Sequence, residues 1–191
     1  GNNAYAHLDS LDKAVADAGG YSALFSEMGF DVTLALDLDS RSMAATLLEF
    51  YDSIAPDDVV LFAYSGHGWS DGRENFLMPT DIAGQGSQED IRKASFAVRN
   101  GGSGIIDEIV RRGPRLTVAI IDACRENPFT LPAQQSRVVI GSQGLVTGDA
   151  TGTFIAFSAG DGQQALDNIS GSDPVPYSVF TRYFLHELSK P

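Results

Sequence analysis

The sequence predicts an α/β fold in which helices cover both faces of a mostly parallel sheet, and two patterns support this prediction. Residues 59–64 and 116–121 form continuous apolar runs, which are typical of parallel strands buried on both faces. Segments with apolar residues at helical spacing alternate with these runs. The chain has 191 residues, of which 43% are hydrophobic, and this suffices for one packed core. We therefore expect a single domain over residues 1–191.

The first part of the chain is predicted to contain one helix and one strand. Apolar residues recur at helical spacing over residues 9–30, with polar residues available as caps at the start. The pair Gly19-Gly20 weakens the middle of this helix, so two shorter helices are an alternative. Residues 31–36 are predicted to form a strand. The chain opens at Gly1 in a turn-rich stretch, and one interpretation is that a first strand before it is missing.

The later elements are predicted from the same patterns. An amphipathic helix over residues 40–54 precedes the first apolar run, and a short helix over 104–112 precedes the second. A strand over 153–158 and a helix over 177–188 close the chain. Two polar, glycine-rich stretches are long enough to be functional loops, about residues 128–152 and 160–176.

The charge of the chain restricts its partners. Thirteen basic and twenty-five acidic side chains leave a net charge of −12, which repels nucleic acid and anionic lipid. We therefore expect neither nucleic acid nor a membrane as a partner, and cationic ligands are favoured. No run approaches the ~18 apolar residues of a membrane helix. No targeting segment is recognisable either, which favours the cytoplasm.

Two motifs with reactive side chains follow the two apolar runs. Ser65-Gly66-His67-Gly68 comes after the first, and Asp122-Ala123-Cys124-Arg125 comes after the second. In a parallel arrangement His67 and the only cysteine, Cys124, emerge at the same sheet edge, where α/β proteins bind ligands. A histidine can take the proton of a thiol, whose thiolate is the nucleophile. The N–H groups of Gly68 and Cys124 are candidate oxyanion donors. Each residue alone is more often structural, but their pairing at equivalent strand ends favours catalysis.

These two motifs resemble the histidine and cysteine motifs of caspase-like cysteine peptidases, the group that includes metacaspases, paracaspases and bacterial homologues. Cys124 follows His67 by 57 residues, near the ~50 typical of caspases. The resemblance implies a caspase-like three-layer fold and peptide-bond hydrolysis by a Cys–His dyad. Cys124 would be the nucleophile and His67 the acid/base group, with no third member. Weaker likenesses extend over nearly the whole chain, in residues 1–5, 11–18, 155–159 and 177–181.

The resemblance also implies cleavage after a basic residue. Animal caspases have glutamine two positions before the cysteine, whereas metacaspases and paracaspases have an acidic residue there that lines a pocket for Arg or Lys. This chain has Asp122 at that position, and Asp17 matches a second acidic position on the first helix. Two carboxylates bind a guanidinium bidentately, which favours Arg. The alternatives are a strand-end cap for Asp122 and a solvated helix face for Asp17.

Paracaspases carry a third acidic residue after the next strand, and this chain departs from that pattern. Gln164 falls there, which leaves the choice between Arg and Lys open. Ser158, Asp161 and Gln164 are further pocket candidates, and Asp167 is a substitute acidic residue.

Control of the site is less well indicated by the sequence. Self-cleavage after Arg137, in the loop after the cysteine, is one prediction, and a chance surface arginine is the alternative. Catalysis by a Cys–His dyad requires no cofactor and no metal. Calcium activation stays open, because the loops are acidic but lack EF-hand spacing. Trp69 is either a subsite wall or a packing residue, and Ser65 beside the dyad is of interest.

Other functions are carried as alternatives. The alternatives are a catalytically silent interaction module with the caspase fold, a zymogen that needs activation, and a redox-sensing thiol protein. A nucleotide-binding domain is disfavoured because no phosphate-binding glycine motif is present. Oligomeric state stays undetermined.

Overall fold

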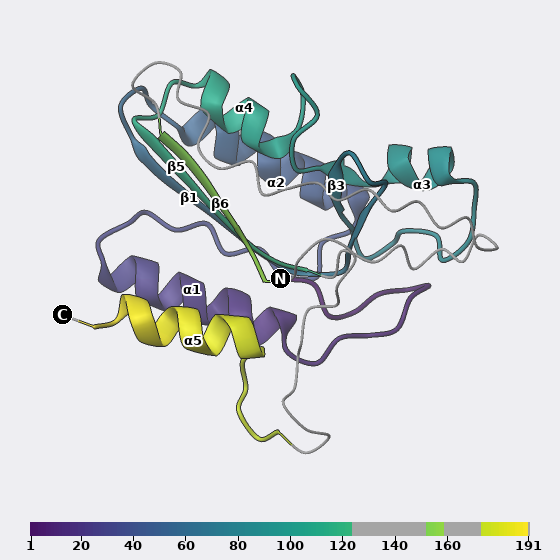
Figure 1. The fold of residues 1–191 in the computed structure, drawn as a ribbon, viewed down its shortest axis with the longest axis horizontal. Helices are drawn as coiled ribbons and strands as arrows, with labels where there is room; N and C mark the ends of the chain where they lie inside the picture. Colours follow the sequence, from purple (N-terminus) through teal and green to yellow (C-terminus); the bar gives the residue numbers. More distant parts are fainter. Residues whose placement is uncertain (124–151, 159–172, 191) are drawn as a thin grey trace.

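The computed structural model describes residues 1–123, 152–158 and 173–190, and these residues form the expected α/β architecture (Figure 1). The central sheet has the order β1-β5-β6 and is parallel. Its strands are β1 (Val59–Gly66), β5 (Leu116–Ala123) and β6 (Gly152–Phe157). β1 and β5 pair along their whole length, so Gly66 lies opposite Ala123 at their carboxyl ends. The reactive motifs therefore leave the sheet at one edge.

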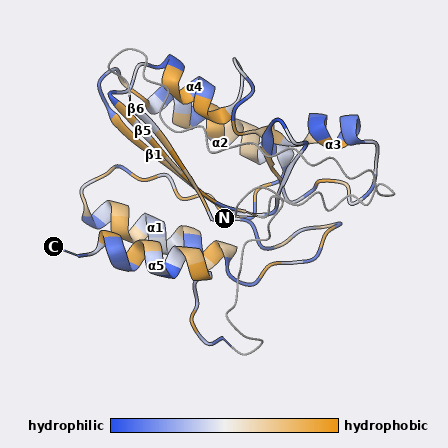
Figure 2. Cartoon of the chain, in the orientation of Figure 1, coloured by the Kyte–Doolittle hydropathy of each residue, from blue (hydrophilic) through white to orange (hydrophobic). Residues whose placement is uncertain are grey.

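Helices cover both faces of this sheet. The helices on one face are α2 (Ser40–Ser53) and α4 (Ile105–Arg111), and those on the other are α1 (Ala14–Glu27) and α5 (Val179–Leu188). Figure 2 shows apolar strands between the two helix layers. Because each strand is covered on both sides, its sequence does not alternate between apolar and polar residues. The strands predicted over residues 59–64, 116–121 and 153–158 and the helices α2, α4 and α5 are confirmed to within two residues at each end. Leu48, which belongs to the apolar pattern of α2, is nevertheless 60% exposed.

A second, antiparallel sheet has no counterpart in the predicted elements. It consists of three very short strands, β2 (Gly68–Ser70), β3 (Asn75–Leu77) and β4 (Phe96–Ala97). The helix α3 (Gln88–Ala94) lies between β3 and β4 in the chain. Trp69 is 1% exposed and stacks on Phe76 at 4.6 Å between ring centroids. Its Nε1 donates to Ser95 Oγ at 3.0 Å. These contacts place Trp69 in a packed core beneath the site.

The first helix differs from its prediction. α1 is shorter than residues 9–30 and runs without a break through Gly19-Gly20. Gly20 lies where α1 crosses α5, and a Cβ there would come within 2.7 Å of Leu185 Cδ1. The second glycine therefore serves close helix packing. No side chain of the preceding residue caps the helix, and Asn3 Oδ1 instead accepts the Val15 N–H at 3.1 Å.

The strand predicted over residues 31–36 is wrong, because the structure assigns this segment to no sheet. Its neighbour is Gly1, whose N-terminal group donates to Ala35 O at 2.9 Å and whose carbonyl accepts the Asp37 N–H at 2.9 Å. This pattern is a single parallel bridge. A cavity of about 460 Å³ separates the segment from the free edge of β1, with residues of α1 and α2 in its walls. Within the described residues the segment therefore lacks a strand to pair with.

Candidate active site

His67 lies between the end of β1 and the start of β2, and its main chain is held on both sides. Its N–H donates to Tyr5 Oη at 2.8 Å, and its carbonyl accepts from Tyr64 Oη at 2.9 Å and from the Met78 N–H at 3.0 Å. Burial raises the pKa of Tyr5 to about 12 and raises the pKa of Tyr64 well above its usual value, so both phenols keep their protons. A Cβ at Gly66 would lie 2.6 Å from Tyr64 Oη, so only glycine fits there.

The imidazole of His67 has a defined orientation. Its Nε2 lies 2.8 Å from the carbonyl oxygen of Asp9, and its ring packs on Tyr5 with 4.5 Å between centroids. A carbonyl oxygen only accepts, so Nε2 carries the proton in the neutral ring. Nδ1 is then the atom with a free lone pair. Nδ1 can therefore act as a base toward a neighbouring thiol. Asp9 orients His67 through its main-chain carbonyl, and such a role cannot be predicted from the type of the residue.

Cys124 lies outside the described residues, but the ladder fixes the residues next to it. Ala123 pairs with Gly66, and Cys124 and His67 follow these two residues directly in the chain. Gly68 opposes Leu77, and the Met78 N–H bonds to the His67 carbonyl. This makes Gly68 a non-hydrogen-bonded position of the β2–β3 ladder, so its N–H does not serve β3. Among the described residues, β3 therefore leaves the Gly68 N–H as a candidate donor to a ligand.

Asp17 and Asp122 form a buried acidic pair one step back from the reactive motifs. Asp17 is 1% exposed and Asp122 is 4% exposed. Asp122 pairs with Ser65 across β1 and β5, and the Ser65 hydroxyl donates to Asp17 Oδ2 at 2.8 Å. Burial is the main cause that raises the pKa of Asp17 to about 6, and the negative charge of Asp122 adds to it. The predicted pocket residues are thus brought together.

Neutral donors from the last helix complete this cluster. Ser178 donates its N–H to Asp17 Oδ1 at 2.9 Å and its hydroxyl to Asp122 Oδ2. Thr181 Oγ1 also donates to Asp122 Oδ2, at 3.3 Å. Among the residues that the structure describes, no ion pair involves either carboxylate. Ser178 and Thr181 were not among the residues predicted from the sequence, although a serine just before the last amphipathic helix is a recognisable N-cap signal.

A comparison with protein-family models identifies the family of the chain. The model of the caspase domain of peptidase family C14 matches residues 1–191. The chain belongs to the caspase domain family. The family agrees with the α/β fold and with a peptidase function of the cysteine type. A search of curated proteins gave no match to the chain.

Of the remaining pocket candidates of the caspase domain, Ser158 directly follows β6. Ser158 donates its N–H to Ile121 O at 3.0 Å, and its hydroxyl is buried without a hydrogen-bond partner in the described chain. Asp161, Gln164 and Asp167 lie outside the described residues, as does the predicted cleavage point at Arg137.

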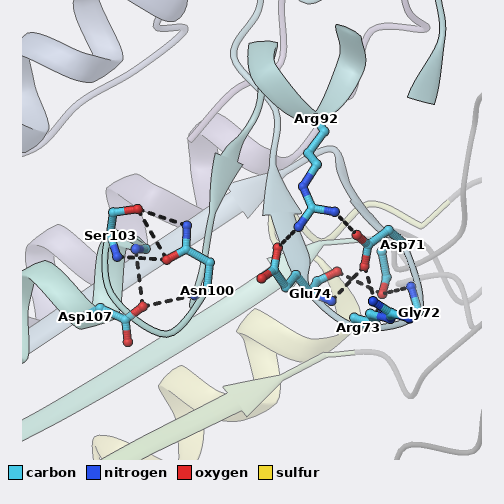
Figure 3. A network of polar contacts seen from close by, with 10 residues as sticks. Asp71, Gly72, Arg73, Glu74, Arg92, Asn100, Ser103 and Asp107 are labelled. Atoms are coloured by element: carbon cyan, nitrogen blue, oxygen red, sulfur yellow. Dashed lines mark hydrogen bonds and ion pairs between the residues drawn. The ribbon is translucent and has the colours of Figure 1, made fainter. Parts of the chain in front are cut away.

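Acidic side chains in the loops of the caspase domain form ion pairs and hydrogen bonds with nearby residues of the same domain. Figure 3 shows the Arg92 guanidinium between Asp71 and Glu74, which ties α3 to the β2–β3 turn. Asp81 accepts from Ser40 at 2.7 Å, and Asp90 accepts from its own helix cap. Within residues 1–123, 152–158 and 173–190, no group of three or more His, Cys, Asp or Glu side chains is arranged to hold a metal ion. In the same ranges, no helix has the length and apolar content to span a membrane.

Proposed function

We propose that this caspase domain is a cysteine endopeptidase that cleaves peptide bonds after Arg or Lys by a dyad of His67 and Cys124. The observation that carries the proposal is the buried pair of Asp17 and Asp122, which only neutral donors contact among the described residues. Two buried like charges are unfavourable unless a cation joins them. A substrate guanidinium or ammonium supplies that cation, whereas an aspartate side chain would be repelled.

The position of the pair supports its assignment to the substrate side chain that precedes the scissile bond. Ser65 and Asp122 each stand two residues before a member of the dyad, on neighbouring strands. A side chain bound between the carboxylates would leave its own carbonyl near the strand ends. Charge-assisted hydrogen bonds to a buried carboxylate are short and strong, and a guanidinium forms them bidentately. Arg is therefore the favoured residue, with Lys second.

In the proposed reaction His67 Nδ1 takes the proton of Cys124, and the thiolate attacks the carbonyl carbon. The oxyanion that forms accepts hydrogen bonds from the N–H groups of Gly68 and Cys124. The imidazolium returns its proton to the leaving amine as the C–N bond breaks, which leaves an acyl-enzyme. Water then gives a proton to Nδ1 and attacks the thioester. The acid product leaves as the C–S bond breaks, and Nδ1 returns its proton to the sulfur, which restores the thiol.

Fluorogenic peptides that differ only at the residue before the scissile bond test this proposal. Arg, Lys, citrulline and Asp would be compared, with and without calcium. Citrulline has the shape of Arg without its charge. Turnover of the Arg peptide that Cys124→Ala and His67→Ala each abolish is the expected result. Cleavage of the Asp peptide alone would refute the acidic pocket. Absence of turnover together with a Cys124 inert to alkylation would favour an interaction module.

A further inference from the structure

Ser178 connects the last helix to both buried carboxylates. It is 1% exposed and is the N-cap of α5. Its Oγ accepts the Thr181 N–H at 3.0 Å, as in an ordinary N-cap, and the same hydroxyl donates its proton to Asp122 Oδ2. Its own N–H donates to Asp17 Oδ1 at 2.9 Å. Because a carboxylate accepts and does not donate, the single hydroxyl proton of Ser178 is committed to Asp122.

These contacts make the two oxygens of Asp122 unequal. Oδ2 receives the hydroxyls of Ser178 and Thr181, whereas Oδ1 receives no donor from the described residues. Both oxygens of Asp17 are already engaged, by the Ser178 N–H and by the Ser65 hydroxyl. Within the described pair, Oδ1 of Asp122 is therefore the oxygen left for a ligand.

The main chain around Ser178 is held independently of its side chain. The Tyr177 carbonyl accepts from Lys13 Nζ at 3.3 Å and from Arg182 Nη2 at 3.0 Å. The Ser178 carbonyl accepts the Arg182 N–H at 3.0 Å. Removal of the hydroxyl alone should therefore leave the Ser178 N–H on Asp17. The same change removes the hydrogen bond from the Ser178 hydroxyl to Asp122.

We propose that Ser178 is a positioning residue for substrate specificity, whose hydroxyl fixes the rotation of the Asp122 carboxylate so that Oδ1 faces the cation of a basic substrate side chain. This inference rests on the proposed function. The proposed role of Ser178 differs from that of a purely structural N-cap in one respect. Capping requires only that Oγ accepts from Thr181, whereas orienting Asp122 requires that the hydroxyl also donates.

The substitution Ser178→Ala tests this role by comparison of Arg and citrulline peptides. Hydrogen bonds to charged groups correspond to roughly a 10- to 100-fold change in an equilibrium. KM for the Arg peptide should therefore rise about tenfold or more, while its kcat changes by less than about threefold. KM for the citrulline peptide should stay near the wild-type value, because that side chain carries no charge for Asp122 to bind. The preference for Arg over citrulline should fall accordingly.

Three further variants separate positioning from folding. Ser178→Thr keeps the hydroxyl and should keep the preference for Arg. Ser178→Gly removes the hydroxyl but is well tolerated at an N-cap, so it should lose the preference even if the alanine variant folds poorly. Ser87→Ala is the matched control, since Ser87 caps α3 by accepting the Asp90 N–H at 3.2 Å. It should leave the preference unchanged.

The outcomes distinguish this inference from the proposed function beneath it. A wild-type enzyme that prefers Arg, together with alanine and glycine variants that keep the preference, would overturn the role of Ser178 alone. An equal loss on Arg and citrulline peptides would also overturn it, because this is the signature of a general structural effect. A wild-type enzyme without preference for Arg over citrulline would refute the acidic pocket itself, and the role of Ser178 with it.

Discussion

Replacing Asp17 by asparagine should make the protein more stable at neutral pH, although it weakens the proposed pocket. Burial raises the pKa of this carboxyl from 3.8 to about 6. The fold therefore prefers the protonated form, and ionisation of Asp17 costs stability as the pH rises from its unfolded pKa to its folded pKa. Asparagine never ionises and so avoids this cost. Its Oδ1 can still accept the Ser178 N–H, and its amide can donate to the Ser65 hydroxyl.

The size of the effect follows from the two pKa values. The cost of ionising Asp17 is about 3 kcal/mol at pH 8, about 1.6 kcal/mol at pH 5 and about 0.6 kcal/mol at pH 4. Any loss from the imperfect amide contacts is independent of pH. The stability gained by Asp17→Asn should therefore be about 1.4 kcal/mol larger at pH 8 than at pH 5.

Urea unfolding at 25 °C from pH 5 to pH 8 measures this difference. A Cys124→Ala background excludes self-cleavage in every sample. Asp12→Asn is the matched control, because Asp12 is an exposed aspartate just before the same helix and should give almost no change. A gain for Asp17→Asn that is the same at pH 5 and pH 8, or one that grows as the pH falls, would refute the argument from burial.

Three further predictions concern the packing that supports the site. Gly19→Ala should stabilise α1 by about 0.5–1 kcal/mol, because a Cβ there meets nothing within 4 Å. Gly20→Ala should destabilise the protein, because a Cβ there would lie 2.7 Å from α5. Urea unfolding that ranks the stabilities of the two variants the other way would contradict this prediction. Tyr5→Phe removes the hydroxyl that accepts the His67 N–H but keeps the ring, so kcat should fall about tenfold with little change in KM, and an unchanged kcat would show that this bond does not position His67. Extension of the chain before Gly1 by about six apolar residues should place a strand in the cavity beside β1 and slow amide exchange in β1; unchanged exchange would show that the cavity takes no strand.

The parallel strands and the site beyond them could be predicted because burial on both faces leaves a clear record in the sequence. Two apolar runs identify β1 and β5, and the residues just before His67 and Cys124 pair at the ends of these strands. Asp122 could be placed for the same reason, since it belongs to the end of one run. Asp17 could be assigned only through resemblance to a family, and α1 brings it into contact with Ser65 and Ser178.

The parts that could not be predicted depend on contacts distant in sequence or on very short elements. Ser178 reaches Asp17 across 161 positions, and no local spacing encodes such a contact. The strands β2, β3 and β4 contain two or three residues each, too few for an alternating pattern to be visible. Residues 31–36 have the composition of a strand but have no strand to pair with in the described chain, and a strand is defined by its ladder rather than by its composition alone.

The most direct test of the acidic pocket couples a change in Asp122 to a change in the charge of the substrate. kcat/KM would be measured for Arg and citrulline peptides with the wild-type protein and with Asp122→Asn. The pocket predicts that the variant loses at least about tenfold on the Arg peptide and little on the citrulline peptide, so that the two changes are strongly coupled. Equal losses on both peptides, or a preference for Arg that persists in the variant, would contradict recognition of a basic residue by this carboxylate.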